Sequence, residues 1–167
     1  AQKTVTTLST VQIIDVVDAA IARLLHPDDP YRRKMEDLRP VITGYDAEIV
    51  RLGLTRYLKT FRKPELLRFL AEDFSNPQIL DGFQPLIKGG FGRAYGPDVL
   101  AHIWAGNVPG LPLWSLVSGL LVKAGNIGKT SSAEPLFAVW VAQVLVGVDP
   151  VVGEGFAIMW WRGGVCG

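Results

Sequence analysis

The chain has 167 residues, 49% of them hydrophobic and 20% charged, and its formal net charge is +1. This composition is typical of one globular domain with a sizeable core and excludes a disordered chain. The balanced charge gives no basic surface for nucleic acid. The longest apolar run, at about residues 111–122, is shorter than the roughly 20 residues that a membrane span requires.

The few cysteines and histidines exclude further classes of site. A single cysteine, Cys166, cannot form an internal disulfide or a paired-cysteine metal site, and His26 and His102 lie too far apart for a metal-ligand motif. The first residues show no basic segment followed by an apolar one, so no secretion signal is seen. We therefore expect no metal and a cytoplasmic location.

The first 75 residues predict a helical region. Apolar residues recur at helical spacing after Thr10, which is the expected N-cap of the first helix. The polar segment at residues 28–40 predicts a short exposed helix. Asp46 is expected to cap a third helix, and Pro64 lies in the first turn of a fourth, where proline is favoured.

Residues 76–97 form a second segment, which is rich in Gly, Pro and aromatic residues. It predicts short strands around residues 86–88 and 91–95, arranged as a hairpin or meander. Its Gly-Gly-Phe-Gly sequence at residues 89–92 lacks the spacing of a phosphate-binding loop and precedes no helix, so we interpret it as a turn.

Residues 98–167 predict an α/β unit. Strands and helices alternate as βαβαβ, which is typical of a parallel sheet and of one mononucleotide-binding half. Charged residues are scarce here, which favours strands buried on both faces. The strands are expected at residues 99–105, 126–131 and 156–161, and the helices at residues 113–124 and 135–146.

Two polar residues stand at the ends of neighbouring strands in this unit. Asn107 follows Gly106 after the first strand, and Lys129 lies near the end of the second. In an open parallel sheet, ligands bind outside the carboxyl ends of the strands, so both side chains should face one crevice. The Asn107 amide could donate to a carbonyl oxygen or could only satisfy the turn backbone. Lys129 and the hydroxyls that follow it could bind an anion or a sugar, or could be a solvated strand end.

Three other polar residues are interpreted as structural. His102 lies inside an apolar strand and is expected to be a core histidine. Cys166 has no base near it in the sequence and is not expected to be a nucleophile. Glu134 follows Ser131 by three residues, which is the spacing of a capping box at the start of a helix.

The resemblance to a known family rests on three segments: LLRFLAEDFSNPQILDGFQP, AYGPDVLAHIWAGNVPGLPLWSLVSGLLVKAGNIGKTSSAEPLF and WWRGG. They resemble the acyl-CoA reductases of the bioluminescence long-chain fatty acid reductase type, in the aldehyde dehydrogenase superfamily. The resemblance covers about residues 63–164 and, more loosely, the helices before them. It implies an aldehyde dehydrogenase-like, Rossmann-like fold, of which this chain is an N-terminal fragment.

The resemblance also implies roles for both strand ends. Residues 105–109 match the superfamily motif Pro-Trp-Asn-x-Pro, whose Asn is an oxyanion donor, so Asn107 is implied to be catalytic. Residues 129–132 match a Lys-Pro-Ser-Glu turn that holds the adenosine ribose of the cofactor. The implied cofactor-binding residues are Trp104, Gly106, Lys129, Thr130, Ser131 and Ser132.

Two departures from the family pattern have consequences. Ser132 stands where the family has a glutamate that binds the ribose 2′-hydroxyl, so no carboxylate repels a 2′-phosphate there. This favours NADPH over NADH, with Lys129 as a counter-charge. Secondly, the superfamily nucleophile is a cysteine far downstream, and Cys166 does not match its position. We therefore expect that the chain is truncated at its C-terminus and is inactive alone.

The activity implied for the full-length protein is NADPH-dependent reduction of a long-chain acyl-CoA, or another acyl thioester, to the fatty aldehyde through a cysteine thioester. The implied partners are that thioester, an acyl-transferring enzyme and further copies of the chain. The alternative interpretation is a non-catalytic nucleotide-binding or subunit-interaction module. The expected layout is a helical region at residues 1–75, a connecting segment at residues 76–97 and the first part of an NADP(H)-binding domain at residues 98–167.

Overall fold

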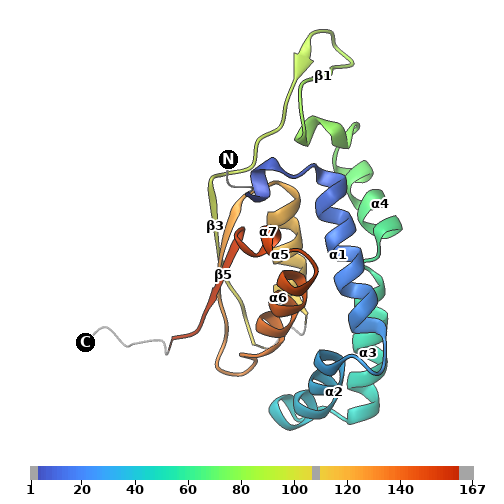
Figure 1. Cartoon of the computed structure of the whole chain (residues 1–167), viewed down its shortest axis with the longest axis vertical. Coiled ribbons are helices and arrows are strands. Elements are labelled where there is room, and N and C mark those ends of the chain that lie inside the picture. Colours follow the sequence, from blue (N-terminus) through green and yellow to red (C-terminus); the bar gives the residue numbers. More distant parts are fainter. Residues whose placement is uncertain (1–3, 107–109, 162–167) are drawn as a thin grey trace, which may run out of the picture.

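The computed structural model describes residues 4–106 and 110–161. Its elements lie in layers: a parallel sheet on one side, helices α5 and α6 against it, and the N-terminal helices outside them (Figure 1). A small hairpin projects from one end of the molecule, and helices α2 and α3 lie at the other end. A short 3-10 helix, η1 (Val5–Thr7), precedes the first long helix.

Helix α1 (Thr10–Leu25) begins one residue earlier than predicted. Its N-cap is Ser9, whose hydroxyl accepts from the Gln12 backbone while the Gln12 side chain accepts from the Ser9 backbone. This reciprocal capping box satisfies two free backbone donors. The expected N-cap, Thr10, is therefore wrong: its backbone N–H and its hydroxyl both donate to Asp81, at 2.8 and 2.9 Å, and it is buried.

Helix α2 (Pro30–Thr43) corrects the prediction of a short exposed helix. It has 14 residues, with Asp29 as its N-cap and Gly44 as a left-handed C-cap. Arg32, Met35 and Arg39 are buried in it, because this face contacts helices α3 and α6. The segment is so polar that its buried face could not be recognised from hydrophobicity.

The next two helices begin where the sequence predicted. Asp46 caps α3 (Ala47–Lys59) by accepting from the backbone of the second and third helical residues, and Pro64 lies in the first turn of α4 (Lys63–Asp73). Both predictions are confirmed, because an N-cap carboxylate and a first-turn proline each suit the free N–H groups of a helix start. A 3-10 helix, η2 (Pro77–Leu80), follows.

The predicted hairpin is present, with its strands displaced. Strand β1 (Gln84–Pro85) pairs antiparallel with β2 (Phe91–Gly92), and residues 86–88, predicted as a strand, belong to the turn region instead. Gly89 and Gly90 have φ values of +89° and +81°, a conformation that favours glycine, so the Gly-Gly-Phe-Gly turn is confirmed.

The βαβαβ unit is confirmed in order and direction. Strands β3, β4 and β5 form a parallel sheet in that spatial order, joined by helices α5 and α6 and by a short α7 that was not predicted. The bounds are β3 (Val99–Ile103), α5 (Leu111–Leu121), β4 (Gly125–Lys129), α6 (Phe137–Val148), α7 (Pro150–Gly153) and β5 (Phe156–Met159).

In the part of the chain that the structure describes, the sheet is covered on one face only, which corrects the expectation of strands buried on both faces. Because the strand order advances in one direction, both crossovers place their helices on the same side. The opposite face presents Val99, Ala101, Ile103, Ile127 and Met159, all exposed. The low charge content of this segment correctly indicated apolar strands. It did not indicate whether helices would cover one face of the sheet or both.

One hydrophobic cluster holds the layers together. Helix α1 contributes Ile13, Ile14 and Val17, each fully buried, and it contacts both α5 and α6. The same cluster includes Phe61 after α3 and Phe137 at the start of α6. Residues 4–75 therefore share a core with residues 98–106 and 110–161.

Candidate functional site

The carboxyl ends of the three parallel strands lie level with one another. Ile103 pairs with Lys129, and Lys129 pairs with Met159. The ladder continues for one further residue on two strands, since the Trp104 N–H donates to the Lys129 carbonyl at 3.0 Å and the Thr130 N–H donates to the Met159 carbonyl at 2.9 Å. This edge, which we call the carboxyl edge, is where parallel α/β sheets bind ligands.

Lys129 is half-buried at the centre of the carboxyl edge. Its ammonium lies 3.5 Å from the Thr130 carbonyl and 5.3 Å from the centre of the Trp161 ring, over which it is placed. No carboxylate of the described residues lies within 4.0 Å of this ammonium. The Lys129 ammonium therefore contacts one carbonyl oxygen and one aromatic face. It keeps N–H donors that could bind an anion.

The turn after Lys129 meets the segment after β3. A Cβ built on Gly106 would lie 2.5 Å from the Ser131 hydroxyl oxygen, so only glycine allows this close approach. The Ser131 hydroxyl oxygen accepts from the Ala133 N–H at 3.2 Å, and Ser132 is exposed. The fold thus brings together Gly106, Lys129, Ser131 and Ser132.

Glu134 supports this turn from beneath. It is buried, pairs with Ser131 in an isolated β-bridge, and its Oε1 accepts from the Phe137 N–H at 3.1 Å. Burial raises its pKa, while Arg39 and the Phe137 N–H oppose the change. The predicted structural role of Glu134 is confirmed. The predicted capping box is wrong, because helix α6 starts at Phe137 and the Ser131 hydroxyl serves the turn instead.

Two of the predicted cofactor residues are buried. The Thr130 hydroxyl donates to the Met159 carbonyl at 3.3 Å, and the Trp104 indole N–H is buried with no hydrogen-bond partner among the described residues. The outer ring of Trp104 covers Gly128, where a Cβ would overlap it. The side chains of Trp104 and Thr130 therefore lie on the buried side of the carboxyl edge.

His102 forms a chain of hydrogen bonds that the sequence did not reveal in full. Its Nε2 lies 2.9 Å from Asn126 Oδ1, and its Nδ1 bonds to the Ser115 hydroxyl. The Asn126 amide nitrogen donates to the carbonyls of Ala124 and Gly155, so Oδ1 is left as the acceptor and His102 Nε2 must donate. The prediction that His102 is structural and hydrogen-bonded is confirmed, but the side chain is half-buried and does not belong to the buried core.

Asn107, the predicted oxyanion donor, lies outside the described residues, as does Cys166. The chain resumes at Gly110, which has a φ of +85° and whose carbonyl accepts from the Tyr57 hydroxyl. Helix α5 begins at the next residue. Gly106 and Gly110, the described residues that flank residues 107–109, therefore lie at the carboxyl edge and at the start of α5.

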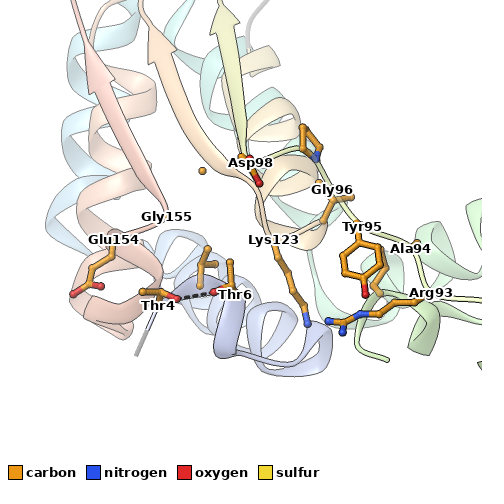
Figure 2. Close-up of a pocket in the computed structure, with 15 residues that line it drawn as sticks. Thr4, Thr6, Arg93, Ala94, Tyr95, Gly96, Asp98, Lys123, Glu154 and Gly155 are labelled. Carbon is orange, nitrogen blue, oxygen red and sulfur yellow. Dashed lines mark hydrogen bonds between the residues drawn. The ribbon is translucent and has the colours of Figure 1, made fainter. Parts of the chain in front are cut away.

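A different cavity, of about 510 Å³, lies at the amino ends of the strands (Figure 2). Arg93, Tyr95, Lys123 and Glu154 line it, and none of the predicted site residues does. Lys123 is held there by Asp81, 2.6 Å from its ammonium. We place the candidate site at the carboxyl edge instead, because the polar residues there share the geometry that binds ligands in such sheets.

Metal sites and membrane spans are both absent from the part of the chain that the structure describes. No group of three or more His, Cys, Asp or Glu side chains there could hold a metal ion. No helix there is both long enough and apolar enough to cross a membrane.

The described chain is thus an α/β protein with a cationic, hydroxyl-rich turn at the carboxyl edge of a parallel sheet. A family model for acyl-CoA reductase (LuxC) matches residues 5–165, and the chain belongs to this family.

Three similar proteins are bacterial. A long-chain acyl-protein thioester reductase 2 from Photobacterium leiognathi is 27% identical over 80% of this chain and 29% of that protein. Long-chain acyl-protein thioester reductases from Photobacterium phosphoreum and Aliivibrio fischeri are 26% and 27% identical, over 78% and 80% of this chain and 28% and 29% of theirs. The chain therefore spans less than a third of the length of the relatives that it matches.

Proposed function

We propose that this chain is the cofactor-binding part of an enzyme that reduces a long-chain fatty acyl thioester to the aldehyde with NADPH. The observation that carries the proposal is the position of Lys129: a half-buried ammonium without a carboxylate partner among the described residues, beside exposed Ser132, at the carboxyl edge. Membership of the acyl-CoA reductase family supports the same assignment.

The proposed fold of the full-length protein is aldehyde dehydrogenase-like, with this sheet as the first half of a Rossmann-like domain. The βαβαβ order and the sheet direction support it. The proposed substrate is an acyl thioester, either acyl-CoA or an acyl group on a partner enzyme. The names of the relatives support this class, since they describe reductases of long-chain acyl-protein thioesters.

The residues at the carboxyl edge fit a phosphorylated adenosine ribose. Lys129 offers a charge and donors, the exposed Ser132 offers a hydroxyl, and the nearest acidic residue of the turn, Glu134, is buried beneath it. A 2′-phosphate brings nearly two negative charges and several acceptor oxygens, which an ammonium and a hydroxyl can partly satisfy. Gly106 keeps the two chain segments close enough to shape one site.

In the proposed reaction, the acyl group passes from its thioester to a cysteine of the full-length protein, and NADPH, when bound, supplies the hydride. Asn107 donates a hydrogen bond to the thioester oxygen as negative charge develops on it. Lys129, Ser131 and Ser132 orient the ribose end of the cofactor. Trp104 and Thr130 hold the backbone of the edge in place from the buried side.

The test is the cofactor preference of the full-length enzyme. Ser132→Glu should weaken NADPH and spare NADH, changing the ratio of kcat/KM values by about tenfold to a hundredfold, the scale of a charged contact. Ser132→Gln, which has nearly the same size and no charge, is the matched control. Lys129→Ala should weaken both cofactors, NADPH more, whereas Lys88→Ala, on the distant hairpin, should change neither.

Three results would contradict the proposal. If the wild type prefers NADH, the assignment of NADPH is wrong. If Ser132→Glu and Ser132→Gln give the same ratio, the ribose does not bind at this turn. An enzyme that binds the cofactor but reduces no acyl thioester would favour a nucleotide-binding module instead.

A further inference from the structure

Helix α2 buries two arginines that differ in how their donors are used. The Arg32 guanidinium donates to Glu36, to the Leu24 carbonyl and to the Thr55 hydroxyl, as a buried arginine is expected to do. Arg39 is only 6% exposed, and its Nε is buried without a hydrogen-bond partner. Among the described residues, no side-chain hydrogen bond or ion pair of Arg39 is found.

The groups around Arg39 leave its donors free. Its guanidinium carbon lies 4.8 Å from the centre of the Phe137 ring, an aromatic face that attracts the cation but supplies no oxygen or nitrogen acceptor. Glu134 is near enough to favour the charged form of Arg39, but no hydrogen bond or ion pair joins the two side chains, and Glu134 Oε1 accepts from the Phe137 N–H. The Tyr57 hydroxyl donates to the Gly110 carbonyl.

A cavity of about 240 Å³ adjoins this arginine, between helices α2 and α3. Arg39 and Tyr45 line it together with Ile49, Val50 and Gly53, so the arginine is the one charged residue of a mostly apolar wall. A buried guanidinium with unused donors costs free energy unless an acceptor completes it. Because Arg39 lines the cavity, an acceptor there could reach the outer nitrogens of its guanidinium, although not the buried Nε.

We propose that this cavity, which we call the Arg39 pocket, binds the carboxylate of a fatty acid or similar alkyl carboxylate. The planar fork of a guanidinium matches a carboxylate with two parallel hydrogen bonds. The aliphatic wall of Ile49 and Val50 suits the carbons next to that carboxylate. The proposal does not depend on the proposed reductase activity.

The size and chemistry of the pocket favour an alkyl carboxylate over an inorganic anion. Its volume equals that of about eight waters at roughly 30 Å³ each, which is enough for the head group and several carbons of a chain. The described residues that line it offer no second cation to balance a doubly charged phosphate. Ile49 is exposed, so the rest of a longer chain can leave the pocket along the surface of α3.

The experiment measures binding of octanoate to the full-length protein by isothermal titration calorimetry, with octanol and inorganic phosphate as separate probes. Octanoate should bind at least about tenfold more tightly than either probe, because only octanoate offers both an alkyl chain and a carboxylate. Arg39→Gln should weaken octanoate by at least about tenfold, because the amide lacks the charge and the fork.

A second variant tests the pocket without changing Arg39. A Cβ on Gly53 would meet nothing within 4 Å, so Gly53→Leu should fill the pocket while α3 stays intact. It should abolish octanoate binding with no loss of thermal stability. Val41→Leu, at an exposed position of α2 that does not line the pocket, is the matched control and should bind octanoate like the wild type.

Three results would overturn the proposal. They are unchanged octanoate binding in Gly53→Leu, phosphate or octanol binding as tight as octanoate, and no octanoate binding to the wild type. Cofactor preference is measured separately, with the Lys129 and Ser132 variants. If octanoate does not bind, the proposed reductase function is unaffected. If the cofactor preference is not as expected, the proposal for the Arg39 pocket is unaffected.

Discussion

The outer ring of Trp104 occupies the space into which a side chain at residue 128 would project, so Gly128 is the residue that lets the ring lie on the middle strand. Trp104 is buried, and its ring also stacks on His102, with 5.8 Å between the ring centres. Gly128 and His102 therefore both contact the Trp104 ring. This contact fixes the floor of the carboxyl edge beside Lys129.

Gly128→Ala should lower the free energy of unfolding by about 1–3 kcal/mol, the usual cost of overpacking a core. Chemical denaturation of wild type and variant measures the difference. Gly82→Ala, where a Cβ meets nothing within 4 Å, is the control. The cost should shrink in a Trp104→Phe background, because phenylalanine lacks the outermost ring atoms. A loss no greater than that of Gly82→Ala would contradict the contact.

The ion pair between Asp18 and Arg62 should make stability depend on pH. Arg62 Nε lies 2.5 Å from Asp18 Oδ1, and the Lys63 N–H donates to the same oxygen at 2.7 Å, which joins α1 to the start of α4. The hydrogen bond from Arg62 lowers the pKa of Asp18, although burial opposes it. Because the folded pKa lies below the unfolded value, the stabilisation is present above about pH 4 and is lost as the pH falls through the folded pKa.

Asp18→Asn should therefore cost about 1 kcal/mol at pH 7, a value that allows for the half-exposed Arg62. The difference from the wild type should shrink as the pH falls below about 4, the ordinary pKa of an Asp, and passes through the lowered pKa of Asp18. Asp15→Asn removes the exposed pair with Lys63 and should cost less than about 0.5 kcal/mol. A loss for Asp18→Asn that stays constant over this pH range would exclude the charge as its cause.

Asn107→Ala should lower kcat of the full-length enzyme by roughly two to three orders of magnitude, the cost of losing one oxyanion donor. The KM for the cofactor should change little, because the amide acts on the substrate carbonyl. Steady-state kinetics with a saturating acyl-CoA checks both values. A kcat within about threefold of the wild type would remove Asn107 from the mechanism.

The sequence predicted those parts of the fold that local chemistry decides. Asp46, Pro64 and the paired glycines at residues 89–90 each suit a helix start or a turn through their own side chain or their lack of one. The βαβαβ order follows from alternating patterns, and its parallel direction follows from the length of the crossovers. These features need no knowledge of the tertiary structure.

The predictions from the sequence were wrong where tertiary contacts determine the structure. Arg32, Met35 and Arg39 recur at spacings of three and four residues on α2, a helical period that could have indicated a buried face if arginine were not read as exposed. Ser9, not Thr10, is the N-cap of α1, because Thr10 donates hydrogen bonds to Asp81, 71 residues away. The stacking of Trp161 beneath Lys129 and the pocket at Arg39 likewise join distant segments.

The candidate site was predicted in part. The sequence placed Lys129 at a strand end, and the structure adds that Gly106 and Ser131 approach each other there. Burial separates Trp104 and Thr130 from the exposed Ser132, a distinction that no motif contains.

The uncovered face of the sheet has a practical consequence for handling this chain. Val99, Ile103 and Ile127 expose aliphatic side chains next to two strands, β3 and β5, that each have a neighbour on one side only in the described sheet. Unpaired strand edges beside an apolar surface are templates for self-association. A sample limited to these 167 residues should therefore aggregate as its concentration rises, and a lysine in place of Ile103 should raise its solubility.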